Sequence, residues 1–208
     1  MSARNYHETL WRALPEGLAP AGFELRRSFL LDRVQPGERV LDVGSGEGLF
    51  ASALRGAGAR VLAADVAEEP LRRAQRRDPA LEVALIGAEG GWELPDAAFD
   101  VVWAGEVIEH VADTAAWLSE LRRVLRSGGR LLLSTPSLGR AQLLAAALSR
   151  RAFAARFEPR SDHLRFYSRD TLAALICEFG FEQVSVRGAG GPPWAHRWLL
   201  ASAVRSRF

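Results

Sequence analysis

The sequence contains no lysine, a single cysteine and no long apolar run, and each shortage argues against a class of protein. All 27 basic residues among the 208 are arginine, and 25 acidic residues leave a formal net charge of +2. Arginines scattered along a chain indicate a solvated surface, so nucleic acid is not an expected partner. Cys177 alone forms no internal disulfide, which fits a reducing compartment. No run reaches the length of a signal-peptide core or membrane span, so we expect a cytoplasmic protein.

Short apolar runs alternate with helical patterns along the chain. The runs predict strands at 39–43, 60–66, 81–86, 99–104, 129–135 and 182–188, with one more strand, at a sheet edge, in 194–208. Helical spacing predicts helices within 47–58, 69–77, 113–129 and 168–181. Asp113 and Ser168 are the expected N-caps, and Gly180 is the expected glycine after the last helix. Apolar strands separated by helices indicate an α/β fold, with a doubly wound, mostly parallel sheet covered on both faces.

The segment VLDVGSGEGLF, residues 40–50, places three glycines within five residues directly after a predicted strand. In doubly wound folds ligands bind beyond the carboxyl ends of strands, and a glycine loop there lets a ligand approach the backbone closely. A dinucleotide loop needs the spacing GxGxxG, whereas this loop reads GxGxG and has Leu49 at the place of the third glycine. Asp42 and Glu47 add carboxylates that would repel a diphosphate and attract an ammonium group.

A further carboxylate, Asp65, stands at the end of the next predicted strand. A carboxylate about twenty residues past such a loop accepts hydrogen bonds from the hydroxyls of a ribose. The acidic residues of the loop and Asp65 together therefore predict a nucleoside that carries an amino-acid-like group.

Four segments carry a resemblance to a known family, in the order VLDVGSGEGLFASAL, VLAADVAEEPLRRA, LPDAAFDVVWAGEVIEHVAD and ELRRVLRSGGRLLLSTPS. Together they resemble class I S-adenosylmethionine-dependent methyltransferases, especially the branch of ubiquinone-biosynthesis O-methyltransferases and related small-molecule enzymes. The resemblance spans residues 36–188. It implies a Rossmann-like seven-stranded sheet, S-adenosylmethionine as the cofactor, and O-methylation of a small acceptor of lipophilic or glycosylated character.

The resemblance also implies a role for each residue of the cofactor site. The methionine part of the cofactor would be wrapped by Asp42, Gly44, Ser45 and Gly46. Asp65 would bind the ribose, Val66 would contact the adenine, and Gly105 would approach the transferred methyl group. Relatives commonly carry GDA after the third strand, whereas this chain reads GAE, so the adenine would face either Glu89 or backbone groups near Ala88.

Two upstream features complete the expected site. Arg26 stands where some relatives place an arginine on the cofactor carboxylate. Tyr6, His7 and Trp11 would either close over the site as a flap or belong to a packed amphipathic helix.

The candidate catalytic residues gather around the motif EVIEH, directly after the fourth predicted strand. In a helical segment, Glu106, Glu109 and His110 would share one face. His163 follows the segment after the fifth strand and would face the same pocket. If the acceptor atom is a hydroxyl oxygen, a histidine base contributes a factor of about 10² to 10⁴. The candidate catalytic residues are therefore His110, Glu106 and His163, with a structural role for the histidines as the alternative.

The resemblance leaves a metal site and other activities open. Some ubiquinone-pathway O-methyltransferases, and the methyltransferases of small-RNA 3′ ends, use an ExxEH element for a divalent metal. A Mg²⁺, Mn²⁺ or Zn²⁺ site, although not favoured, would use Glu106, Glu109, His110 and His163. The alternative functions are a metal-dependent RNA 3′-terminal 2′-O-methyltransferase, a dehydrogenase, and a non-catalytic module that binds S-adenosylmethionine or its demethylated product.

The length suits one domain, which divides into four segments by pattern. These are an N-terminal helical flap (1–35), a cofactor-binding core (36–136), a lid or substrate insertion (137–167), and a C-terminal helix with strands (168–208). In the insertion, arginines flank apolar residues at helical spacing. This pattern predicts a helical lid packed on the core or, alternatively, a helix that contacts a lipophilic substrate or a membrane surface.

Overall fold

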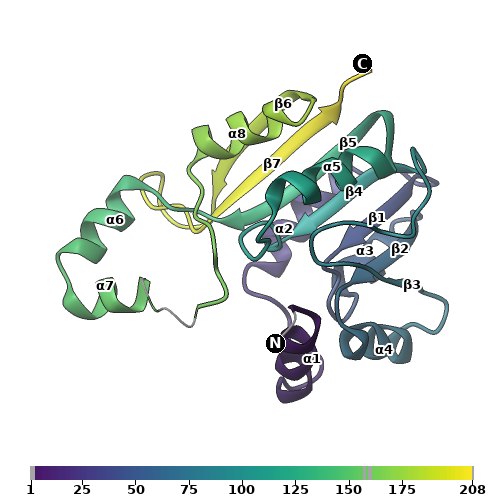
Figure 1. Cartoon of the computed structure of the whole chain (residues 1–208), viewed down its shortest axis with the longest axis horizontal. Helices are drawn as coiled ribbons and strands as arrows, with labels where there is room; N and C mark the ends of the chain where they lie inside the picture. Colours follow the sequence, from purple (N-terminus) through teal and green to yellow (C-terminus); the bar gives the residue numbers. More distant parts are fainter. Residues whose placement is uncertain (1–2, 157, 159–160, 208) are drawn as a thin grey trace.

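The computed structural model describes residues 3–156, 158 and 161–207, and in them seven strands form one sheet flanked by eight helices (Figure 1). The strands are β1 (Arg39–Val43), β2 (Arg60–Asp65), β3 (Glu82–Leu85), β4 (Phe99–Gly105), β5 (Leu125–Pro136), β6 (Phe181–Ala189) and β7 (Trp198–Arg205). The helices are α1 (Ala3–Ala13), α2 (Phe23–Leu31), α3 (Leu49–Gly56), α4 (Glu68–Arg77), α5 (Thr114–Val124), α6 (Arg140–Ala147), α7 (Arg150–Arg156) and α8 (Arg169–Glu178). This arrangement confirms the predicted α/β fold.

The sheet has the order β3-β2-β1-β4-β5-β7-β6. Strands β1 to β5 run parallel to one another, and β7 runs antiparallel to both β5 and β6. The carboxyl ends of β1, β2 and β4 therefore meet at one edge, and the order reverses on either side of β1. That edge is where ligands bind in doubly wound folds.

The predicted edge position of the last strand is wrong, because β7 lies inside the sheet. Leu199, Leu200 and Ala201 are buried in succession, so this run needs a neighbour on each side. In β6, by contrast, buried or half-buried side chains alternate with exposed ones over much of the strand, which is typical of a sheet edge. The tail thus supplies an interior strand, and β6 forms the edge.

Local capping signals fix several helix ends as expected. The Asp113 carboxylate accepts a hydrogen bond from the Ala116 N–H at 2.9 Å, and Ser168 Oγ accepts one from the Thr171 N–H at 3.2 Å. Gly180 has φ of +77°, the left-handed conformation that follows many helices. Helix α5, however, ends before the predicted glycine stop, because Leu125 is already extended and pairs with Phe99 of β4.

Apolar side chains fill both faces of the sheet. One buried cluster joins β4 and β5 to α5 and α8 through Trp117, Leu121 and Ile176. The other joins the opposite face to α2, α3 and α4, and it contains Trp103, which is fully buried. The core therefore leaves the carboxyl edge of the strands free for a site.

The insertion after β5 is helical, but α6 and α7 project away from the sheet instead of packing on it (Figure 1). Leu144, Leu148 and Phe153 are 63, 81 and 51% exposed. Hydrogen bonds hold the base of the insertion, as from the Leu138 N–H to the Tyr167 carbonyl and from Gln142 Nε2 to the His196 carbonyl. Residues 157, 159 and 160 of the predicted insertion lie outside the described residues. None of the helices in the described chain has the length and apolar content for crossing a bilayer.

Candidate active site

The glycine loop after β1 is shaped by close approach of protein atoms. Gly44 and Gly46 both have positive φ, at +68° and +53°. A Cβ on Gly44 would lie 2.4 Å from a methyl carbon of Val107, and one on Gly46 would lie 3.0 Å from the Trp11 ring. Glycine is required at both positions because any side chain would be strained and crowded.

Asp65, at the end of β2, stabilises this loop by binding its backbone. Its carboxylate accepts hydrogen bonds from the N–H groups of Gly46 and Ala67, each at 3.0 Å. Asp65 is 5% exposed and lines a cavity of about 230 Å³ at the carboxyl edge of the sheet. The same carboxylate thus organises the loop and faces the cavity.

Most of the expected cofactor residues line this cavity or its neighbour. The first cavity is lined by the expected residues Gly44, Asp65, Val66, Ala88 and Glu89, together with the candidate catalytic residues Glu106 and His110. A second cavity of about 210 Å³ is lined by the expected residues Gly44, Ser45, Gly46, Gly105 and Glu106, together with Arg26 and Trp103. Gly44 and Glu106 line both cavities, which are therefore adjacent parts of one site.

Several buried polar atoms in β1 and around the second cavity have no hydrogen-bond partner among the described residues. They are Asp42 Oδ2, Ser45 Oγ, Arg26 Nε and Trp103 Nε1. Buried polar groups are nearly always paired, so an unpaired group of this kind requires an explanation. An acceptor, a hydroxyl and two donors around a glycine loop are complementary to a ligand with both an ammonium and a carboxylate. The methionine part of S-adenosylmethionine has both groups, so the residues present fit this cofactor.

The site also holds an excess of buried acidic groups. Burial, and secondly Asp65, raise the pKa of Asp42 to about 7. Burial likewise raises the pKa of Asp65 and of Glu106. Burial, followed by the charge of Glu106, raises the pKa of Glu109 to about 8. A positively charged ligand would stabilise the ionised form of these carboxyls, whereas a diphosphate would repel it.

Glu106 is held in a strained position between the two cavities. Its φ is +59°, which is uncommon outside glycine. Its Oε1 accepts a hydrogen bond from Ser134 Oγ at 3.0 Å and lies 3.8 Å from Nη1 of Arg26. Backbone strain at a cavity wall is typical of functional sites.

Two acidic residues have roles that the sequence did not reveal. The Glu47 carboxylate, expected to attract an ammonium group, instead pairs with Arg73 at 2.9 Å and with Arg77 at 3.3 Å. The Glu89 carboxylate accepts hydrogen bonds from the N–H groups of Ala112 and Asp113. Glu89 therefore stabilises the backbone just before α5, although it also lines the first cavity.

The histidines form a row beside the first cavity. The His110 and His163 ring centroids lie 4.8 Å apart, and those of His110 and His7 lie 6.4 Å apart. His110 Nδ1 lies 3.0 Å from the carbonyl oxygen of Asp162. Because a carbonyl only accepts, Nδ1 carries the proton and Nε2 of the neutral ring has the lone pair. Burial lowers the pKa of His110 and so favours this neutral form.

Of the four expected metal ligands, three come together. Ligand atoms of Glu109, His110 and His163 all lie within 4.8 Å of one another. Glu106 is not part of this group, since its carboxylate bonds to Ser134 and faces Arg26. The structure thus places three of the four expected metal ligands together and separates Glu106 from them.

The cavity walls include residues that the sequence did not single out. Helix α1 lines the first cavity with His7 and Trp11, two residues of the expected flap or packed helix, and with Leu10, which had no sequence signal. Trp117, a buried residue of α5, also lines this cavity. Asp162 had no sequence signal, because its contact depends on how the chain returns from the insertion.

Comparison with known proteins decides the family. A family model described as a methyltransferase domain matches residues 11–186. The chain belongs to this methyltransferase family. It is 32% identical over 188 residues to the ubiquinone biosynthesis O-methyltransferase of Ruegeria sp. (strain TM1040), with 86% of this chain and 74% of that protein covered. It is 41% identical over 112 residues to the malonyl-[acyl-carrier protein] O-methyltransferase of Serratia marcescens, covering 54% of this chain and 44% of that protein.

Solved methyltransferases share the fold. An S-adenosylmethionine-dependent methyltransferase from Mesorhizobium loti has a TM-score of 0.68 and 21% identity, over 90% of this chain and 99% of that one. A phosphoethanolamine N-methyltransferase from Haemonchus contortus, in complex with S-adenosylmethionine, has a TM-score of 0.71 and 18% identity. This chain is covered to 91% there but spans only 54% of that longer chain. The protein is thus a class I S-adenosylmethionine-dependent methyltransferase, and the dehydrogenase alternative is excluded.

Proposed function

We propose that this methyltransferase methylates an oxygen atom of a small-molecule acceptor, with His110 as the general base. The observation that carries the proposal is the orientation of His110, whose Nδ1 is bonded to the Asp162 carbonyl while the ring lines the cavity. Relatives named as O-methyltransferases, at 32% and 41% identity, support oxygen as the methylated atom.

In the proposed site, S-adenosylmethionine supplies an electrophilic methyl group when it is bound. Asp42, Ser45 and Arg26 would hold its methionine part, since each has an unpaired buried atom beside the glycine loop. Asp65 would bind the ribose. Val66 and the backbone near Ala88 would contact the adenine. The Glu89 carboxylate already accepts hydrogen bonds from the backbone N–H groups just before α5.

The acceptor would enter beside Glu106 and His110. Gly105 has no side chain and leaves room near the proposed path of the methyl group. His110 Nε2 would accept the hydroxyl proton of the acceptor, and His163 would position the His110 ring through their edge contact. Because methyl transfer is an in-line displacement, orientation of the acceptor would supply much of the remaining rate enhancement.

A panel of acceptors with isotopically labelled S-adenosylmethionine tests the proposal. The panel contains a phenol, the same phenol with an isoprenoid tail, a carboxylic acid, a primary amine, and an RNA with a free 3′ end. Label on a phenol oxygen supports the proposal. Label only on the carboxylic acid supports oxygen as the methylated atom but contradicts His110 as the base, because a carboxylate has no proton to remove. Label only on the amine, or only on RNA with an added divalent metal, contradicts it. Tight S-adenosylhomocysteine binding without transfer to any acceptor identifies a binding module instead.

We further propose that the α6–α7 arm contacts lipid, in a protein that otherwise works in the cytoplasm. Its exposed apolar side chains, Leu143, Leu144, Leu148 and Phe153, are accompanied by exposed arginines at 140, 150 and 151. This combination fits an anionic membrane surface. The Leu144→Glu/Leu148→Glu variant should lose flotation with anionic vesicles, whereas Ala147→Glu, which adds charge without removing an apolar side chain, should retain more. Equal flotation of all three proteins would contradict the proposal.

A further inference from the structure

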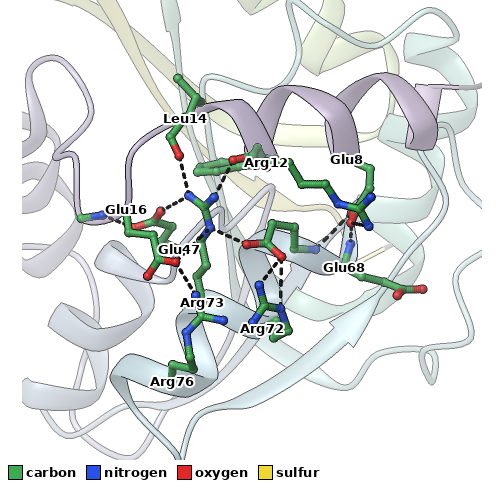
Figure 2. Close-up of polar contacts among 12 residues, drawn as sticks. Glu8, Arg12, Leu14, Glu16, Glu47, Glu68, Arg72, Arg73 and Arg76 are labelled. Atoms are coloured by element: carbon green, nitrogen blue, oxygen red, sulfur yellow. Dashed lines mark hydrogen bonds and ion pairs between the residues drawn. The ribbon is translucent and has the colours of Figure 1, made fainter.

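A buried arginine of α4 binds the carboxyl end of α1 (Figure 2). Arg73 Nη2 donates to the Trp11 carbonyl at 2.7 Å, and Nη1 donates to the Leu14 carbonyl at 3.0 Å. The same guanidinium pairs with Glu47 at 2.9 Å and with Glu69 at 2.7 Å. Arg73 thus binds carbonyls in the last turn of α1 and just after it, and a cation there complements the helix dipole.

A glutamate of α1 binds the amino end of α4 in return. Glu8 Oε2 accepts hydrogen bonds from the N–H groups of Glu68 at 2.9 Å and Glu69 at 3.1 Å, at the first turn of α4 (Figure 2). Each helix therefore caps the other, and α1 is attached to α4 at two points. We call the Arg73 and Glu8 contacts the two clasps.

The Arg73 clasp reaches the glycine loop through Glu47, which lies between Gly46 and Gly48. Glu47 also accepts a hydrogen bond from the Gly17 N–H at 2.7 Å, in the segment that follows α1. Gly17 has φ of +80°, a conformation that suits a turn or hinge. The loop, the segment after α1 and α4 are thus joined around one ion pair.

Between the clasps, α1 covers the first cavity. His7, Leu10, Trp11 and Leu14 line that cavity, and the Trp11 ring lies against Gly46. A helix of 11 residues is barely stable alone in water, so its position depends on these attachments. Loss of the clasps would therefore release the helix without disturbing the sheet.

We propose that α1 is a lid that supplies His7 and Trp11 to the cofactor cavity, and that Arg73 and Glu8 hold it closed. The inference rests on the cofactor site proposed above. The closed lid covers the nucleoside and brings His7 toward His110, and the lid must open for the spent cofactor to leave.

The rate of S-adenosylhomocysteine release, measured by stopped-flow displacement, tests the lid. Arg73→Met should speed release about tenfold to hundredfold, the scale expected for loss of hydrogen bonds to a charged group. Association should also become faster, because the lid no longer blocks entry. Arg72→Met is the matched control, since Arg72 lies on the same helix, is exposed, and pairs with Glu69. Release from Arg73→Met at the control rate would overturn the proposal.

A second variant covers the case in which Arg73→Met does not fold. Glu8→Ala removes the other clasp without leaving the Glu47 carboxylate unpaired, and it should also speed release. Hydrogen exchange of residues 3–14 should slow when S-adenosylhomocysteine binds the wild-type protein, and should be fast in Glu8→Ala. Unchanged exchange in both comparisons would refute the lid. Failure of the wild-type protein to bind S-adenosylhomocysteine in calorimetry would instead refute the cofactor site.

Discussion

The carboxylate of Asp65 accepts a hydrogen bond from the backbone N–H of Gly46, at 3.0 Å. One side chain thereby connects the end of β2 to the loop after β1. Since β1 and β2 are adjacent parallel strands, their carboxyl ends lie side by side and this contact needs no long side chain. The proposed ribose and methionine subsites are consequently joined by one buried group.

Asp65→Ala should weaken S-adenosylhomocysteine binding by about 1.5 to 3 kcal/mol or more, the scale of hydrogen bonds to a charged group. The loss combines the ribose contacts with the support of Gly46. Isothermal titration calorimetry measures it, with Asp170→Ala, an exposed aspartate of α8, as the control. Unchanged affinity would contradict the ribose assignment.

Asp42→Asn should stabilise the cofactor-free protein at pH 8 while it weakens cofactor binding. The folded-state pKa of about 7 lies above the ordinary value of 3.8, so the native state retains a proton that the unfolded state loses. Wild-type stability therefore falls as the pH rises from 4 to 7, and an uncharged asparagine avoids this loss.

We expect a gain of about 4 kcal/mol in the free energy of unfolding at pH 8, shrinking toward pH 4, from urea titrations. The comparison variant is Asp78→Asn. The hydrogen bond from Arg55 is the main cause that lowers the pKa of Asp78, so its replacement should destabilise the protein near neutral pH. A pH-independent effect of Asp42→Asn would contradict the raised pKa.

His110→Ala should reduce turnover by about 10² to 10⁴ and leave the dissociation constant of S-adenosylhomocysteine nearly unchanged, because a base acts on the acceptor. Parallel kinetics and calorimetry separate the two effects. His163→Ala should reduce turnover less than His110→Ala does, because His163 packs against His110 rather than lining the first cavity. Equal losses of turnover and affinity in His110→Ala would count against its placement.

Removal of divalent cations with a chelator should leave turnover on the preferred acceptor unchanged. The reason is geometric, since Glu106 is directed to Ser134 and Arg26 and not toward Glu109, His110 and His163. Metal analysis of the purified protein provides the independent check. Loss of activity on chelation, restored by Mg²⁺, Mn²⁺ or Zn²⁺, would contradict this prediction and assign Glu109, His110 and His163 to a metal site.

Local signals in the sequence predicted much of the fold and the position of the site. Strands β1 and β2, the caps Asp113 and Ser168, and the glycine loop each depend on residues close together in the chain. The proposed roles of Asp42 and Asp65 follow from strand ends, which the pattern locates well. Their roles in binding stay predictions.

The sequence did not predict contacts between segments that are far apart in the chain. Glu47 was interpreted as a ligand group because nothing local shows that Arg73 of α4 faces the glycine loop. The contact of Asp162 with His110 depends on the path of the chain after the α6–α7 arm. The interior place of β7 reflects the competition of two strands for β5, and the more continuously apolar strand occupies it.

That interior place has a consequence for synthesis on the ribosome. Residues 181–189 emerge before residues 198–205, yet among the described strands β6 pairs only with β7. Until translation delivers the later strand, β5 exposes an unpaired backbone edge and β6 has no partner in the sheet. Nascent chains halted in this interval would be prone to self-association through the exposed edge of β5.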